Sequence, residues 1–83
     1  MPVVFRHKGC RFLFYSNEGD PREPAHVHAL KDGVDAKFWL VPLVELAYND
    51  GHSAKTLREL HQLLIERREV LLGAWNEFFS ESN

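Results

Sequence analysis

Apolar and polar residues alternate along the first half of the chain, which is the pattern of half-buried β-strands. The alternation is clearest in residues 26–40, around Asp32 and Gly33. Asp-Gly between two alternating segments is typical of a two-residue type I′ hairpin turn. Such a turn places Lys31 opposite Val34, and it thereby fixes the register of both predicted strands.

The two faces of this hairpin differ in chemistry because successive side chains of a strand point to opposite sides. Counting outward from the turn pairs His28 with Lys37 and His26 with Trp39. The apolar face carries Val27, Ala29, Ala36, Phe38 and Leu40. The other face carries His26, His28, Asp35, Lys37 and Trp39. The sequence therefore predicts an apolar sheet face backed by a cluster of polar side chains.

Another hairpin is predicted before this one, because β-prone residues 3–7 and 10–15 flank a Lys-Gly turn. The polar residues 16–25 that follow contain glycine and prolines, and we expect a loop there. The pairs predicted in the first hairpin are Phe5 with Phe12 and Val3 with Phe14 on the core face, and Arg6 with Arg11 on the other face.

The second half of the chain predicts a short strand and then helix. Pro42 interrupts the preceding strand, and residues 43–48 favour a fifth strand over a helical turn. Ser53 supplies the chemistry of a helix start. Apolar residues then recur at helical spacing, at Leu57, Leu60, Leu64, Leu71, Trp75 and Phe78. The charged residues 66–69 interrupt this stripe, so it fits either one long helix or two.

These elements predict an α+β fold. It has a small antiparallel sheet of two hairpins, with four or five strands, covered on one face by a C-terminal helix or helix pair. The chain of 83 residues is expected to form a single domain, residues 1–83, with a thin core. A hydrophobic content of 45% argues against disorder.

Charge and cysteine content narrow the classes of partner and compartment. A net charge of -2 gives no global attraction to nucleic acid or to an anionic membrane. No apolar segment approaches the roughly 18 residues of a membrane span, so no membrane partner is expected. The single cysteine, Cys10, cannot form an internal disulfide, which favours the cytoplasm and a buried, unreactive thiol.

His26 and His28 point the same way from one strand, about 6.5 to 7 Å apart, and could share a metal or an anion. Asp35 is the nearest candidate for a third metal ligand. Other candidates are His7, Glu18, Asp20 and His52. We expect no cofactor. A metal held by His26, His28 and Asp35, a half-exposed polar face, and an anion or RNA site remain the alternatives.

Lys37 opposite His28 suggests a specific chemistry. A neighbouring ammonium favours a neutral imidazole, which can take a 2′-hydroxyl proton while the cation stabilises charge on the phosphate. Trp39 on the same face could stack a base. His26, His28 and Lys37 are therefore the catalytic candidates of a metal-independent ribonuclease.

Two further groups of residues are candidates for binding. Arg6 and Arg11 form a local basic patch on the first hairpin, although such charges also protect strand edges from sheet pairing. Trp75 and Phe79 belong either to the core or to an aromatic edge that docks a partner.

Four segments resemble a family of short bacterial proteins classed as a domain of unknown function, number four-one-six-zero. They are Glu-Pro-Ala-His-Val-His at 23–28, Ala-Lys-Phe-Trp-Leu at 36–40, Val-Glu-Leu-Ala at 44–47 and Ala-Trp-Asn-Glu-Phe-Phe at 74–79. The resemblance implies a small α+β protein, often encoded next to another short protein in pairs that resemble toxin-antitoxin modules. It supplies no established reaction, so no catalytic residue is carried over.

The favoured function is one component of such a two-protein module, acting by binding a small neighbour-encoded protein. The alternatives are a metal-independent ribonuclease or RNA-binding protein that uses His26, His28 and Lys37, and a metal-binding structural domain. The sequence leaves the oligomeric state open, with a homo-oligomer among the alternatives.

Overall fold

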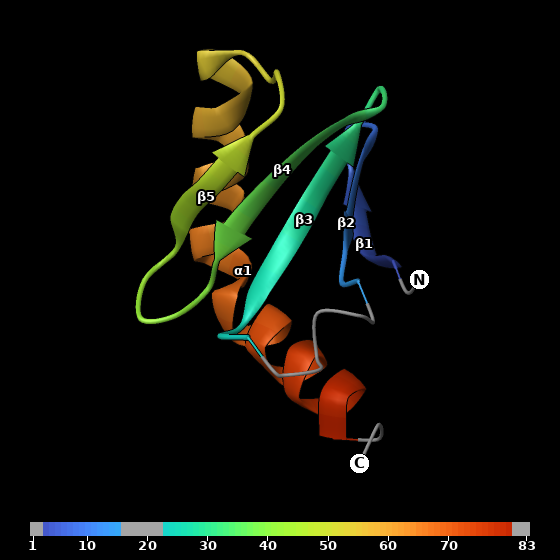
Figure 1. The fold of residues 1–83 in the computed structure, drawn as a ribbon, viewed down its shortest axis with the longest axis vertical. Coiled ribbons are helices and arrows are strands. Elements are labelled where there is room, and N and C mark those ends of the chain that lie inside the picture. The colour runs from blue at the N-terminus through green and yellow to red at the C-terminus, as the bar shows by residue number, and fades with distance from the viewer. Residues whose placement is uncertain (1–2, 16–22, 81–83) are drawn as a thin grey trace.

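A computed structural model describes residues 3–15 and 23–80 of the chain. Five strands form one antiparallel sheet in the order β1-β2-β3-β4-β5, and helix α1 runs along one face of it (Figure 1). This arrangement confirms the predicted α+β class. The elements are β1 (Val3–His7), β2 (Cys10–Leu13), β3 (His26–Lys31), β4 (Val34–Trp39), β5 (Glu45–Asn49) and α1 (Ala54–Ser80).

The central hairpin, β3 and β4, has the predicted register. His28 pairs with Lys37, and every other pair follows from the Asp-Gly turn. Asp32 and Gly33 both have positive φ angles, 53° and 76°, as a type I′ turn requires. The predicted division into an apolar and a polar face therefore holds.

The first hairpin, β1 and β2, follows its prediction only near the turn. The pairs of Phe5 with Phe12 and of Arg6 with Arg11 are confirmed. The predicted pair of Val3 with Phe14 is wrong, because the register shifts between Val3 and Phe5 and brings Val3 opposite Leu13. The expected loop over residues 16–25 lies mostly outside the described residues.

A fifth strand is present, as predicted, but β5 covers residues 45–49 rather than 43–48. It is followed by one helix of 27 residues, which begins where the Thr56 amide donates to Ser53 Oγ at 3.1 Å. In the described part of the chain, no helix is long and apolar enough to cross a membrane.

The charged residues 66–69 do not break α1, because two of them contact the rest of the fold. Arg68 Nε donates to Leu40 O at 2.7 Å, and Arg68 Nη2 donates to Pro42 O at 3.3 Å. The Arg67 guanidinium lies 5.2 Å from the centre of the Phe5 ring. These contacts join α1 to the β4–β5 connection and to β1.

The core lies between α1 and the apolar face of the sheet, where Val27, Ala29, Ala36 and Phe38 are buried. At its lower end in Figure 1, α1 extends past the start of β3. There the aromatic side chains of Phe14, Trp75, Phe78 and Phe79 pack together. Trp75 and Phe79 are only 3% and 2% exposed, so both side chains belong to the core.

Candidate functional site

The polar face of the sheet carries the predicted cluster, and its two histidines and its lysine are buried. His26, His28 and Lys37 are 0%, 1% and 9% exposed. Of the three alternatives for this face, a half-exposed pair of histidines does not agree with this burial. The Tyr15 ring centre lies 4.0 Å from that of His28, and the Trp39 ring centre lies 5.5 Å from that of His26.

Side chains from three neighbouring strands meet in one hydrogen-bonded group. Its members are His28, Asp35 and Tyr48, and we call it the His-Asp-Tyr cluster. His28 Nδ1 on β3 lies 3.2 Å from Asp35 Oδ2 on β4, and the Tyr48 hydroxyl on β5 donates to the same oxygen at 2.6 Å. An ionised carboxylate only accepts hydrogen bonds, so His28 Nδ1 carries the proton. In the neutral ring, Nε2 is then the basic nitrogen. Within residues 3–15 and 23–80, Asp35 Oδ1 is buried and has no hydrogen-bond partner.

His26 is held in the same tautomer by a different acceptor. Its Nδ1 lies 2.9 Å from the carbonyl oxygen of Pro24, so Nδ1 donates and Nε2 is the basic nitrogen. The ring centre lies 5.5 Å from that of His28 and 4.8 Å from that of Trp75 on α1. His26 therefore also touches the helix, at the end of the sheet.

Lys37 is bound to partners within the chain. Its Nζ donates to Glu23 Oε1 at 2.9 Å and lies 4.4 Å from the centre of the Trp39 ring. Trp39 thereby becomes a cation–π partner of Lys37. Glu23 lies within the segment that carries the family resemblance. Because it precedes the hairpin, strand pairing does not predict its contact with Lys37.

Tyr48, like Glu23, belongs to the site although the sequence pattern does not predict it there. A register shift between β4 and β5 brings it opposite Lys37, and alternation alone does not show such a shift. Burial of its hydroxyl and the neighbouring Asp35 carboxylate raise the pKa of Tyr48 well above its ordinary value. Tyr48 therefore remains a hydrogen-bond donor to Asp35 at neutral pH.

The candidate metal ligands do not form a metal site in the described residues. Within residues 3–15 and 23–80, no three His, Cys, Asp or Glu side chains are arranged to hold an ion. His28 and Asp35 are hydrogen-bonded to each other. His52 Nε2 lies 3.3 Å from Ala29 O, within hydrogen-bonding distance. The candidates Glu18 and Asp20 lie outside the described residues.

Removing metal ions is therefore expected to leave the melting temperature unchanged. Protein purified without metal-affinity steps should melt at the same temperature with and without excess EDTA. A metal bound only to the folded state would stabilise it and would raise that temperature. A clear drop in EDTA, reversed by added zinc, would contradict this expectation and restore Asp35 as a ligand.

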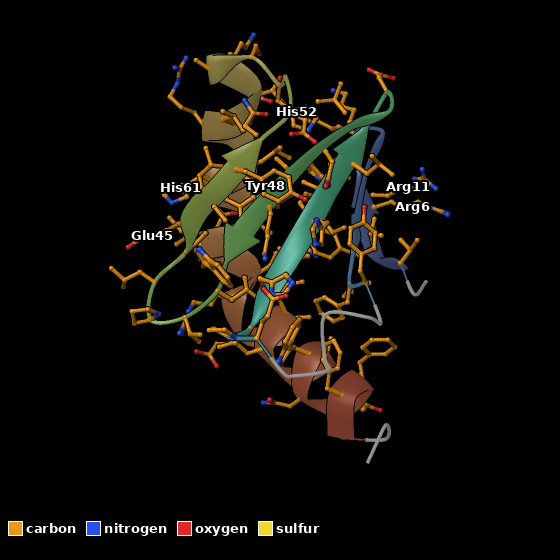
Figure 2. All side chains as sticks on the ribbon, viewed as in Figure 1. Arg6, Arg11, Glu45, Tyr48, His52 and His61 are labelled. Atoms are coloured by element: carbon orange, nitrogen blue, oxygen red, sulfur yellow. The ribbon has the colours of Figure 1, made fainter. Side chains whose placement is uncertain are left out.

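Arg6 and Arg11 are exposed neighbours across β1 and β2, at the edge of the sheet opposite Tyr48 (Figure 2). This position suits both of their predicted roles, a local basic patch and protection of the edge. Cys10, at the start of β2, is 1% exposed. Burial raises the pKa of its thiol from 9.0 to about 11, against the opposing charge of Lys31.

The Cys10 thiol makes the fold less stable at alkaline pH. The unfolded chain loses the thiol proton from pH 9.0, whereas the folded chain keeps it up to about 11. The free energy of unfolding therefore falls as pH rises between these values, by about 2 kcal/mol near the top of the range. The raised pKa of Tyr48 acts in the same direction, so Cys10→Ala serves as the reference. We expect urea denaturation to show a steeper fall in unfolding free energy with pH for the wild type than for Cys10→Ala. Equal slopes for the two proteins would contradict the raised pKa of Cys10.

Two cavities flank the first half of α1. The hairpin cavity, about 450 Å³, is lined by the β1–β2 turn and α1, with His7, Lys8, Cys10, Lys31 and Arg58 among its residues. The edge cavity, about 410 Å³, lies beside β5 and is lined by Phe38, Val44, Glu45, Leu46, Leu57, Arg58 and His61. The His61 Nε2 atom bonds Val44 O at 2.8 Å.

The sequence profile of a family described as a domain of unknown function, DUF4160, matches residues 9–76. No curated protein matches the chain, and no solved structure matches it. The matched residues run from the β1–β2 turn to the last part of α1, and they include the His-Asp-Tyr cluster and all lining residues of the edge cavity. The chain belongs to the DUF4160 family.

Proposed function

We propose that this chain is a protein-binding module, one component of a toxin-antitoxin-like pair, and that it binds a small partner protein by adding a strand of that partner to β5. The observation that carries this proposal is the exposed edge of β5. Leu43, Leu46 and Tyr48 are 66%, 44% and 40% exposed at or beside it.

β5 carries no lysine and no proline, the residues that most often protect a sheet edge, and Glu45 is its only charged side chain. Lysines and prolines on an edge strand hinder pairing with another chain. The other edge, β1, contains Arg6 and is followed directly by Lys8. Glu45–Asn49 contains no lysine, arginine or proline, and four of its five residues are exposed. β5 is therefore the better edge for strand addition.

The edge cavity adds a place for a side chain of the partner. Strand addition gains affinity from main-chain hydrogen bonds and specificity from pockets for alternate side chains. The apolar part of the cavity wall is formed by Phe38, Val44, Leu46 and Leu57. These features fit an extended partner segment that carries an apolar side chain. The family resemblance, which implies a short protein encoded by an adjacent gene, supports a small partner protein.

Leu46→Arg tests this proposal, because it places a charge on β5 at the mouth of the edge cavity. With the purified short protein from the adjacent reading frame, we expect the dissociation constant to rise about 30-fold or more, since a buried apolar anchor contributes about 2 kcal/mol. The measurement is isothermal titration calorimetry, with circular dichroism to check folding.

Val70→Arg is the matched control. Val70 is 63% exposed on α1 and lines neither cavity, so the same substitution there should leave binding unchanged. Equal effects of the two variants, or none, would contradict docking at β5. A wild-type protein that does not bind the neighbour-encoded protein and instead forms dimers would also contradict it. In that case sedimentation should show that Leu46→Arg is monomeric.

The His28–Asp35 pair favours a second candidate function, metal-independent RNA cleavage. A carboxylate that holds Nδ1–H orients the ring and leaves Nε2 as the base, which is the role proposed for His28 from the sequence. Trp39 remains the candidate for base stacking. The burial of His28 and the pairing of Lys37 with Glu23 place this candidate behind the binding module.

RNA cleavage in excess EDTA tests the second candidate. If the chain is a ribonuclease, His28→Gln should lower the rate about 100-fold, the loss expected for a general base. His52→Gln, which changes a histidine outside the cluster, should leave the rate unchanged. Wild-type protein without activity on single-stranded RNA would exclude this candidate and leave the binding module intact.

A further inference from the structure

The hairpin cavity has no part in the proposed docking at β5. Its apolar floor is formed by Cys10, Leu60 and Leu63, which are 1%, 5% and 8% exposed. Its volume of about 450 Å³ lies in the range of small-molecule sites, roughly 300 to 1,000 Å³. The size and the floor together fit a small ligand with an apolar part.

The wall of this cavity has a surplus of positive charge, although the whole chain carries a net charge of -2. Lys8, Lys31 and Arg58 line it, against Glu59 and Glu66. No ion pair joins any of these three cations to a carboxylate in the part of the chain that the structure describes. The Glu66 carboxylate, in turn, accepts a hydrogen bond from Gln62 at 3.2 Å.

We propose that the hairpin cavity binds a small amphipathic monocarboxylate, with its carboxylate beside Lys31 and its short hydrocarbon tail on the floor of Cys10, Leu60 and Leu63. One surplus positive charge matches one carboxylate. Lys31 lines the cavity together with Cys10, Leu60 and Leu63, so the lysine and the apolar floor border the same space. The carboxylate and the hydrocarbon tail of one small ligand can therefore contact neighbouring residues of the cavity at the same time.

Titration of the full chain with hexanoate, followed by ¹H–¹⁵N NMR, tests this site. We expect saturable shifts centred on the amides of Cys10, Leu60 and Leu63. Hexanol has the same tail without the charge and should bind about 10-fold more weakly or worse. Lys31→Gln should weaken hexanoate binding about 10-fold, whereas Lys55→Gln, on α1 but outside the cavity lining, should not.

Three results would overturn the site: hexanol binding as tightly as hexanoate, shifts centred on the edge cavity, or no saturation by hexanoate in the millimolar range. Arg58 lines both cavities, but Leu46 lines only the edge cavity. Leu46→Arg should therefore bind hexanoate with the affinity of the wild type. Failure of the proposed partner docking would not contradict the carboxylate site.

Discussion

Phe38→Ala should lower the free energy of unfolding by about 3 to 5 kcal/mol, the range for removing a buried phenylalanine ring. Phe38 is 1% exposed on the apolar face of β4, between Val27 on β3 and Leu46 on β5. Its ring centre also lies 6.4 Å from that of His61 on α1. The substitution leaves a cavity at the point where both strands and the helix meet.

Urea denaturation measures this loss. Because a domain of this size has only a small reserve of stability, Phe38→Ala can unfold outright, and Phe38→Leu then serves as the milder variant, with an expected loss of about 1 to 2 kcal/mol. Ile65→Ala, at a residue 48% exposed on α1, is the control and should cost less than 1 kcal/mol. A Phe38→Ala loss no greater than that of Ile65→Ala would contradict the position of the core.

Asp35→Ala is expected to have the second largest effect, a loss of about 2 to 4 kcal/mol. It removes the oxygen that accepts from both His28 and Tyr48. Each buried donor left without its acceptor costs about 1 to 3 kcal/mol. The imidazole of His28 is the more costly of the two, because it is 1% exposed, whereas Tyr48 can turn toward water.

A double-mutant cycle between Asp35→Ala and Tyr48→Phe separates these contributions. Tyr48→Phe alone should cost about 1.5 kcal/mol, the lower end of the range for a hydrogen bond to a charged group, because Tyr48 is 40% exposed. In the Asp35→Ala background the same change should cost almost nothing, because the bond is already absent. Additive losses would show that the His-Asp-Tyr cluster is not formed in solution.

Local signals in the sequence predict much of this fold. Asp32 and Gly33 fix the turn and the register of the central hairpin, because their positive φ angles suit few other residues. The leucine stripe predicts α1, because residues three and four apart share one face of a helix. Each of these signals acts over a few residues of the chain.

Contacts between distant residues are what the sequence leaves undetermined. Arg68, in the charged segment of the helix, donates to Leu40 O, 28 residues away, and the sequence pattern does not predict this bond. The bond from Lys37 to Glu23 and the shift that brings in Tyr48 depend on tertiary packing in the same way. Period-two alternation correctly separates the two faces, but it does not show that His26, His28 and Lys37 are buried.

The His-Asp-Tyr cluster also bears on the proposed docking edge. Tyr48 belongs to β5, and its hydroxyl bonds Asp35 in the neighbouring strand. This bond holds the exposed edge to the centre of the sheet. A strand held in an extended shape before binding loses less conformational entropy when a partner strand adds to it.

Hydrogen exchange measured with and without the partner tests docking at β5 most directly. If the purified short neighbour-encoded protein adds a strand there, amide exchange should slow at Glu45–Asn49 and remain unchanged at Val3–His7, the opposite edge of the sheet. A stable complex in which β5 exchanges as fast as in the free protein, with protection at β1 or elsewhere instead, would contradict the proposal.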